Sequence, residues 1–210
     1  MKKRGRQIGA DGEKSRELLL KIAAKQFSLL GFHDTKISAI VKEANVTQPT
    51  FYLYFKSKDA IFQELIDLFK VELFTRVAQS RLPSGIDRSG LLQRITRNIA
   101  LVFQIFQENE HVARIGFFLS ADAIKIKEQM AKRIEENLAV EVENGYFDST
   151  IDINLVATAI VGVIEHLTLT KLWAGLKTPE ELSKEVTRLF LYGLIRENKI
   201  NGNEPDPVLE

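Results

Sequence analysis

The chain has 210 residues, 45% hydrophobic and 27% charged, which is typical of a globular protein with a buried core and not of a disordered chain. It has no cysteine, which excludes disulfides, thiolate metal sites and a cysteine nucleophile. Residues 1–58 hold 12 of the 29 Lys and Arg but only 5 of the 28 Asp and Glu, and this excess of positive charge suggests that the first part of the chain binds a polyanion.

No secretory signal or membrane span is expected. The basic N-terminus lacks the apolar stretch of a signal peptide. The most apolar stretch, residues 153–164, is about twelve residues long before Glu165 interrupts it, whereas a spanning helix needs about twenty. We therefore expect a soluble, cytoplasmic protein.

Apolar residues recur with helical period along the chain, and no alternating strand pattern is convincing. The sequence thus predicts an all-α fold of about nine helices. They are expected at residues 12–30, in a short stretch after Thr35, and at residues 47–55, 57–80, 88–109, 111–120, 121–144, 152–175 and 179–198. The division we expect is a three-helix DNA-binding domain at 1–58, a larger helical domain at 59–198 and a loose tail at 199–210.

Several residues mark the expected helix ends. Gly31 should end the first helix, and Thr35, Thr47 and Ser57 can cap the next three. Asn45 should form the turn between the second and third helices, because Asn tolerates the left-handed conformation. The last helix begins with a predicted capping box, Thr178-Pro179-Glu180-Glu181.

Four aromatic residues crowd the short third helix: Phe51, Tyr52, Tyr54 and Phe55. Phe51 and Phe55 are four residues apart and point about 40° from each other, so both should pack inward. The opposite face is then left open. Two short helices joined by a tight turn are typical of a helix-turn-helix, whose second helix enters the DNA major groove.

The segment from Phe27 to Leu65 resembles the DNA-binding domain of the tetracycline-repressor (TetR) family. The resemblance rests on the Gly31-Phe32 break, on Tyr52-x-Tyr54-Phe55 and on Lys58, among other positions. It implies that bases are met by Gln48, Pro49, Thr50 and Tyr52. It implies phosphate contacts from Thr35, Thr47, Tyr54 and Lys58, with Lys36 able to do either.

One helix-turn-helix reads only a few base pairs, so we expect a homodimer on two half-sites of double-stranded DNA. The last two helices are the best candidates for the dimer interface. The first of them is apolar nearly all round and offers small residues at Ala157, Ala159 and Gly162. The alternative is that both helices are simply core.

The resemblance also implies a pocket for a small apolar or aromatic effector. The expected contacts are Phe103, Phe106, Arg114, Phe117, His166 and Trp173. Each has a structural alternative: the phenylalanines and Trp173 as packing, His166 as a hydrogen-bonded core residue, Arg114 as a surface charge. If an effector binds, the fourth helix is the expected link to the DNA-binding helices.

No catalytic, cofactor or metal site is expected, because the chain lacks the P-loop, dinucleotide, G-x-S-x-G and H-E-x-x-H patterns. The expected function is that of a sequence-specific transcriptional regulator, a repressor that an effector releases from DNA. The alternative is a DNA-binding adaptor or architectural protein whose second domain binds another protein. A roomy cavity in that domain would favour the effector.

Overall fold

The computed structural model describes residues 10–82 and 85–193, and every regular element in these residues is helical, which confirms the all-α prediction. The expected tail at 199–210 and the end of the expected last helix, 194–198, lie outside the described residues. The elements are α1 (Ala10–Asp34), α2 (Ile37–Glu43), α3 (Gln48–Tyr54), α4 (Lys58–Ala78), α5 (Arg88–Glu108), α6 (Glu110–Ala113), η1 (Arg114–Leu119), α7 (Ala123–Glu143), α8 (Ile153–Leu167), η2 (Thr168–Leu172) and α9 (Pro179–Tyr192), where η marks a π-helical segment.

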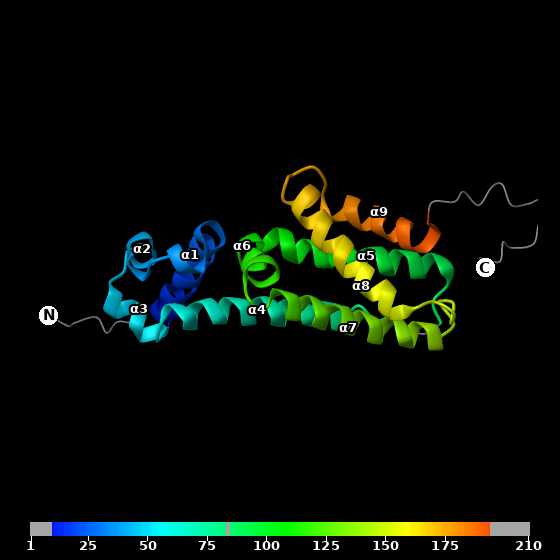
Figure 1. Ribbon diagram of the computed structural model, residues 1–210, viewed down its shortest axis with the longest axis horizontal. Helices are drawn as coiled ribbons and strands as arrows, with labels where there is room; N and C mark the ends of the chain where they lie inside the picture. Colours follow the sequence, from blue (N-terminus) through cyan, green and yellow to red (C-terminus); the bar gives the residue numbers. More distant parts are fainter. Residues whose placement is uncertain (1–9, 83–84, 194–210) are drawn as a thin grey trace, which may run out of the picture.

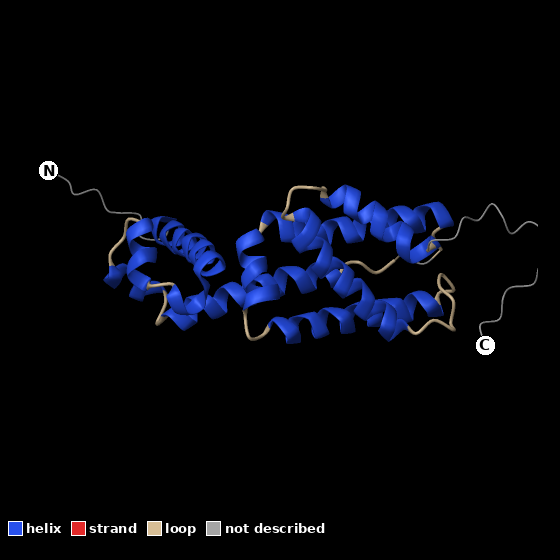
Figure 2. Ribbon diagram, turned by 45° about the horizontal axis from the view of Figure 1, so that its top comes forward, coloured by secondary structure: helices blue, strands red, loops and turns tan. Residues whose placement is uncertain are grey.

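The helices are arranged along one long axis. Figure 1 shows α1, α2 and α3 grouped at one end, with α4 running from this group along the rest of the molecule. Helices α5 and α7–α9 form the other end, where α5 packs on α9 and α7 packs on α8. Figure 2 shows loops, but no strand, between the described helices. α4 is therefore the long element shared by both ends.

Most of the predicted helix ends are confirmed. Gly31 has a positive φ of 79° and interrupts α1, and Asn45 has a positive φ of 53° in the turn before α3. Thr47 accepts a hydrogen bond from the Thr50 N–H, and Ser57 accepts one from the Ala60 N–H. The capping box at Thr178 and Glu181 is present.

The predicted cap at Thr35 is wrong. α2 begins after Lys36, which makes no side-chain cap. The Thr35 side chain is only 1% exposed, and its hydroxyl donates to the Gly31 carbonyl at 2.7 Å. The hydroxyl thus satisfies a carbonyl freed by the Gly31 break and does not serve the following helix.

Two of the predicted helices are not uniform. The helix expected at 111–120 is α6 followed by the π-helical η1, and the helix expected at 152–175 is α8 followed by η2. In η1, a Cβ placed on Gly116 would lie 2.5 Å from Cδ1 of Phe69. Only glycine lets the η1 backbone approach the Phe69 ring of α4 this closely.

Residues Ile153–Leu172 are long and apolar enough to pass for a membrane span by length and composition alone. In the fold, however, α8 packs along α7, and Glu165 of α8 is paired with Lys127 of α7 at 2.5 Å. The remaining apolar face of α8 is exposed in a single chain, although a face of this kind is normally covered.

Candidate DNA-binding surface and ligand cavity

Two phenylalanines hold α3 against the helices behind it. Phe51 is 0% exposed and Phe55 is 2% exposed, and their ring centroids lie 5.5 Å apart. The Arg16 guanidinium of α1 lies 5.3 Å from the centroid of the Phe55 ring and pairs with Glu64 of α4. The predicted inward packing of Phe51 and Phe55 is therefore confirmed, and it fixes which face of α3 is open.

The open face of α3 carries most of the residues expected to meet bases. Gln48 and Pro49 are exposed, and Tyr52 is 53% exposed. Thr50 is half-buried, with its hydroxyl 2.9 Å from that of Thr47. Leu53, which sequence reasoning left out of the site, is 79% exposed on this helix. Its position opposite Phe51 and Phe55 was the available signal, because a leucine there has no core to enter.

Lys58 is used differently from the expectation. Its ammonium donates to the carbonyls of Phe32 at 2.7 Å, Thr35 at 3.0 Å and His33 at 3.2 Å. It also lies 4.4 Å from the centroid of the Phe32 ring. An ammonium has three N–H donors, and all three have acceptors within the chain, which argues against the expected phosphate contact of Lys58. Lys58 instead ties the start of α4 to the link between α1 and α2.

The other expected phosphate contacts divide by exposure. The buried Thr35 side chain leaves its hydroxyl no access to DNA, so only its backbone remains near the start of α2. Thr47 and Lys36 are exposed, and Tyr54 is half-buried. Lys56, between α3 and α4, is exposed as well. Lys36, just before α2, and Lys56, just after α3, are thus exposed basic side chains of the helix-turn-helix.

A carboxylate ties α2 to α1 behind this surface. Glu43 accepts from the Gln26 side-chain amide at 2.8 Å and from the Lys25 ammonium at 3.0 Å. These two hydrogen bonds, that of Gln26 first, lower the pKa of Glu43 below its ordinary value. The charged form of Glu43 therefore helps to hold the helix-turn-helix together.

Five of the six predicted effector contacts lie in or beside an aromatic core. Phe103, Phe106 and Phe117 are fully buried, and Phe106 and Phe117 stack edge-on at 5.0 Å. The Trp173 indole N–H donates to the Phe106 carbonyl at 2.9 Å, and the Arg114 guanidinium lies 4.1 Å from the Trp173 ring centroid. The polar groups of Trp173 and Arg114 thus already have partners within this cluster.

The sixth predicted contact, His166, is exposed on α8. A cavity is present elsewhere, and none of the six predicted residues is among the described residues that line it. The expected effector contacts therefore do not coincide with the cavity, because those aromatic side chains fill the core instead.

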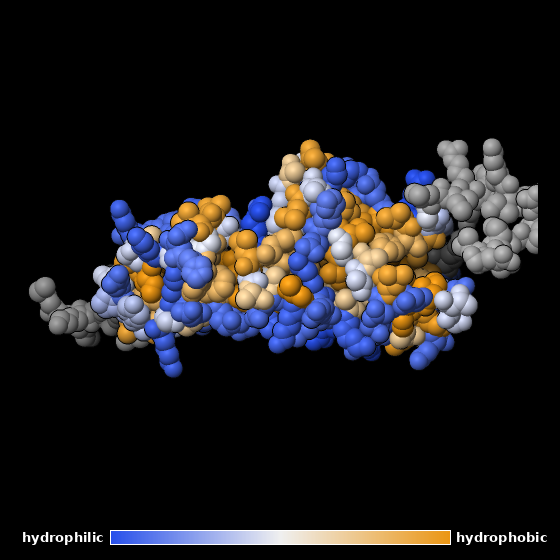
Figure 3. Space-filling view, in the orientation of Figure 1, coloured by the Kyte–Doolittle hydropathy of each residue, from blue (hydrophilic) through white to orange (hydrophobic). Residues whose placement is uncertain are grey.

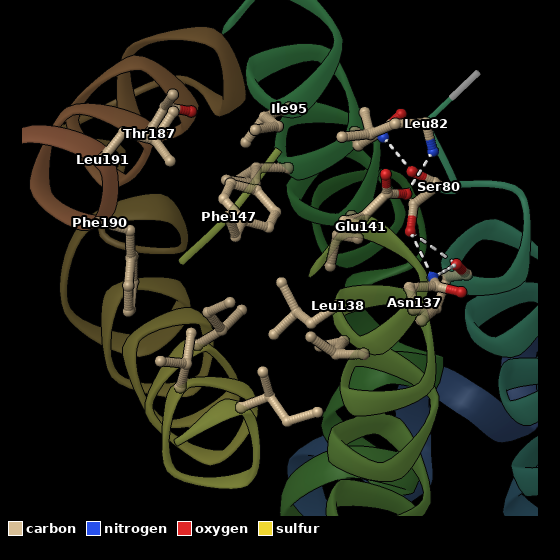
Figure 4. A pocket seen from close by; sticks show the side chains of 18 of the residues that line it. Ser80, Leu82, Ile95, Asn137, Leu138, Glu141, Phe147, Thr187, Phe190 and Leu191 are labelled. Carbon is tan, nitrogen blue, oxygen red and sulfur yellow. Dashed lines mark hydrogen bonds between the residues drawn. The ribbon is translucent and has the colours of Figure 1, made fainter. Parts of the chain in front are cut away.

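The cavity, of about 220 Å³, lies between α4, α5, α7, α8 and α9. Its walls are mainly aliphatic, for example Ile99 of α5, Leu138 of α7 and Ile160 of α8. The polar lining residues are Ser80, Asn98, Asn137, Glu141 and Thr187. Figure 4 shows Ser80, Asn137 and Glu141 on one side of the cavity and Phe190 and Leu191 on the other.

Sequence reasoning missed the polar residues of the cavity. Asn137 and Glu141 are both buried, and they lie four residues apart on α7. They continue the buried face that Ile126 and Met130 begin. The available signal was an apolar helical stripe that turns polar without leaving the core, because buried polar groups in such a stripe often serve a site.

Comparison with known proteins agrees with this geometry. Residues 19–65 match the model of the family described as "Bacterial regulatory proteins, tetR family". The chain is 44% identical over 184 residues to an uncharacterized HTH-type transcriptional regulator, YdgC of Bacillus subtilis, covering 88% of this chain and 94% of that protein.

Solved structures share the fold. The TetR family regulator PfmR from Thermus thermophilus has a TM-score of 0.70 at 21% identity, covering 85% of this chain and 99% of that chain. FadR from Bacillus subtilis in complex with stearoyl-CoA has a TM-score of 0.65 at 20% identity, covering 86% and 100%. Together with the helix-turn-helix geometry and the close relative, these matches show that the chain belongs to the TetR family of DNA-binding transcriptional regulators.

Proposed function

We propose that this cytoplasmic protein is a homodimeric repressor that binds a palindromic operator and leaves it when a small, mainly apolar ligand fills the cavity. The proposal assigns DNA binding to residues 1–58, and ligand binding and dimerisation to residues 59–198. The observation that carries it is the orientation of α3. The buried Phe51 and Phe55 fix this orientation, and Gln48, Pro49 and Tyr52 are exposed on the helix.

The exposed face of α3 suits the major groove. Gln48 offers the amide that pairs with adenine, and Pro49 and Leu53 offer apolar contacts for thymine methyl groups. Thr50 and Tyr52 add hydroxyls beside them. Phosphate contacts from Thr47, Tyr54, Lys36 and Lys56 would fix the helix in its groove without reading sequence. The excess of basic residues in this part of the chain fits that role.

An exposed apolar stripe on α8 supports the homodimer. Leu155, Ala159 and Gly162 are exposed on one face of α8 at steps of four and three residues, and the exposed His166 and, in the following η2, Leu169 continue these steps. Ala159 and Gly162, at the centre, are small and allow a second helix to approach closely. Figure 3 shows apolar patches where Figure 1 places α8 and α9. On this account His166 lies in the dimer interface and does not touch the effector.

Leu189 and Tyr192 of α9 are exposed as well. Two copies of α8 and α9 would cover these residues together in an interface of four helices, formed by the two helices expected to dimerise. Burial in such a dimer interface would also explain why residues Ile153–Leu172 are so apolar, and no membrane is needed to explain it.

The cavity supports a ligand-responsive role over the adaptor alternative, because an adaptor has no need of an apolar hollow in its core. The relative FadR was solved with stearoyl-CoA, so a protein of this fold accommodates a ligand with a long alkyl chain. The aliphatic walls of the present cavity fit an alkyl or similarly apolar body.

α4 is the proposed link between ligand and DNA. It begins at Lys58, which holds the α1–α2 link, and near its other end Val77 lines the cavity. A ligand that shifts the cavity end of α4 would therefore move both recognition helices of the dimer out of register with their half-sites. A coupling of about 1–3 kcal/mol would change operator affinity by roughly 5- to 150-fold.

The dimer is tested by Gly162→Arg, which places a charge in the exposed stripe of α8. We expect the variant to sediment as a monomer and to lose specific operator binding. The matched control is Ile124→Arg, which adds the same side chain at an exposed site of α7. A Gly162→Arg protein that stays dimeric and binds the operator like the control would refute the proposed interface.

A further inference from the structure

The polar lining of the cavity is gathered where the end of α4 meets α5 and α7. Ser80, Asn137 and Glu141 lie together on this side in Figure 4, joined by hydrogen bonds to one another or to nearby backbone. The rest of the wall is apolar apart from Thr187, which is hydrogen-bonded to Thr96. A ligand in the cavity therefore meets one polar end.

Most of the polar groups at this end are already satisfied. The Asn137 amide donates to the Val77 carbonyl at 2.9 Å and to the Ser80 hydroxyl at 3.0 Å, and its oxygen accepts from Arg81 at 3.0 Å. The Asn98 amide donates to the Ser80 carbonyl at 2.6 Å. Their hydrogen bonds fix these side chains in place but leave them little capacity for a ligand.

Glu141 is the exception. It is only 3% exposed, and its Oε1 accepts from the Leu82 N–H at 2.8 Å. Its Oε2 is fully buried and accepts no hydrogen bond from any group that the structure describes. Buried polar atoms in native proteins are nearly always paired, so an orphaned carboxylate oxygen on a side chain that lines the cavity marks a place for a donor.

We infer that the ligand of this cavity is an apolar molecule carrying a hydrogen-bond donor, in the best case an ammonium group, which binds Oε2 of Glu141. This inference rests on the ligand-responsive function proposed above and specifies its ligand class. The donor completes the pairing of Glu141 while the aliphatic walls enclose the apolar body.

The same geometry disfavours an anionic head group. No Lys, Arg or His is among the described residues that line the cavity. Arg81, which bonds Asn137, is exposed and is not part of the lining. A carboxylate ligand would place its negative charge beside Glu141 with no cation in the wall to offset it. The cavity therefore differs from a fatty-acid site although its walls suit an alkyl chain.

The test uses the full-length protein and three probes with the same eight-carbon chain: octylamine, octan-1-ol and octanoate. Isothermal titration calorimetry measures the affinity of each. We expect octylamine to bind about ten- to a hundredfold more tightly than octanoate, because a hydrogen bond to a charged partner has that effect. Octan-1-ol, a neutral donor, should fall between them.

Glu141→Gln keeps an oxygen for the Leu82 N–H but removes the charge, so it should weaken octylamine about tenfold or more and change octan-1-ol by less than about threefold. Glu143→Gln makes the same chemical change at an exposed site on the same helix and should alter neither affinity. Octanoate binding as tightly as octylamine, no binding of any probe, or equal octylamine affinity in both variants would overturn the inference. The wild-type series decides the matter if Glu141→Gln does not fold.

Measuring whether each probe releases the protein from its operator tests the proposed function independently of the ligand class inferred here. Octylamine that binds through Glu141 but leaves the operator complex intact would uphold the ligand class and refute the effector role. Octanoate that releases the operator, with Glu141→Gln behaving like wild type, would uphold the effector role and refute the ligand class.

Discussion

Replacing Lys58 by Met tests whether this lysine stabilises the fold or binds DNA. Met keeps most of the side-chain stem and removes the ammonium that caps the carbonyls of Phe32, His33 and Thr35. Lys56 is the matched comparison, because it is a lysine two residues away and exposed. The structure predicts that Lys58→Met lowers the stability of the protein and that Lys56→Met weakens its contact with DNA phosphate.

The magnitude follows from the hydrogen bonds that are lost. Two of the three bonds of Lys58, to Phe32 and Thr35, are partly buried, and leaving a buried acceptor unpaired costs about 1–3 kcal/mol. The contact with the Phe32 ring adds about 0.5–1 kcal/mol. Allowing for water at the freed carbonyls, Lys58→Met should destabilise the protein by about 2–4 kcal/mol and lower its Tm by roughly 5–15 °C.

DNA binding is then compared at several salt concentrations by fluorescence anisotropy. Each phosphate contact contributes about 0.9 to the slope of log K against log salt, so Lys56→Met should reduce the slope of a dimer by about 1.8. Lys58→Met should leave the slope unchanged under conditions where the variant is folded. The reasoning is refuted if Lys58→Met keeps the wild-type Tm and reduces the slope as Lys56→Met does.

Three further predictions concern bases, packing and pH. Gln48→Ala should cost about 1–3 kcal/mol per half-site and relax the preference at one base pair, measured by binding to a set of single-base operator variants; equal losses on every operator would contradict a base contact. Gly116→Ala should destabilise the protein by about 1–3 kcal/mol in urea unfolding, because the new Cβ would lie 2.5 Å from Phe69. Gly12→Ala, whose Cβ would lie at an ordinary 3.6 Å from the Tyr54 hydroxyl, should not. The pKa of Glu43 is lowered in the fold from its ordinary value of 4.5, so the charged carboxylate stabilises the fold when the pH is above 4.5. That stabilisation is lost as the pH falls through the folded-state pKa. The Tm of Glu43→Gln should therefore fall less than that of wild type between about pH 6 and pH 3, and parallel curves would contradict the role of the carboxylate.

The sequence predicted the helix-turn-helix well because its signals are local. The positive φ of Asn45 and the cap at Thr47 depend on residues within one turn of the chain. The inward seat of Phe51 and Phe55 follows from a spacing of four residues. These features needed no knowledge of distant contacts.

Where the structure departs from the sequence-based expectations, the partners lie far along the chain. Lys58 follows α3 directly and looked free for phosphate, but its acceptors lie between 23 and 26 residues earlier. Phe106 and Phe117 looked like a ligand lining, yet the Phe69 ring from α4 packs against both. Glu141 is paired with the backbone of Leu82, 59 residues away. Which aromatic group fills a core and which polar group borders a cavity is decided by such long-range packing.

The central claim is that α3 reads DNA sequence as part of a dimer. Selection of bound sequences from random duplex DNA, carried out at two salt concentrations, tests it most directly. The account predicts a palindrome with two half-sites about one helical turn apart, or a multiple of it, and an affinity that falls as salt rises. Salt-sensitive binding with no recovered motif would contradict it, because the face of Gln48 and Tyr52 would then touch DNA without reading bases.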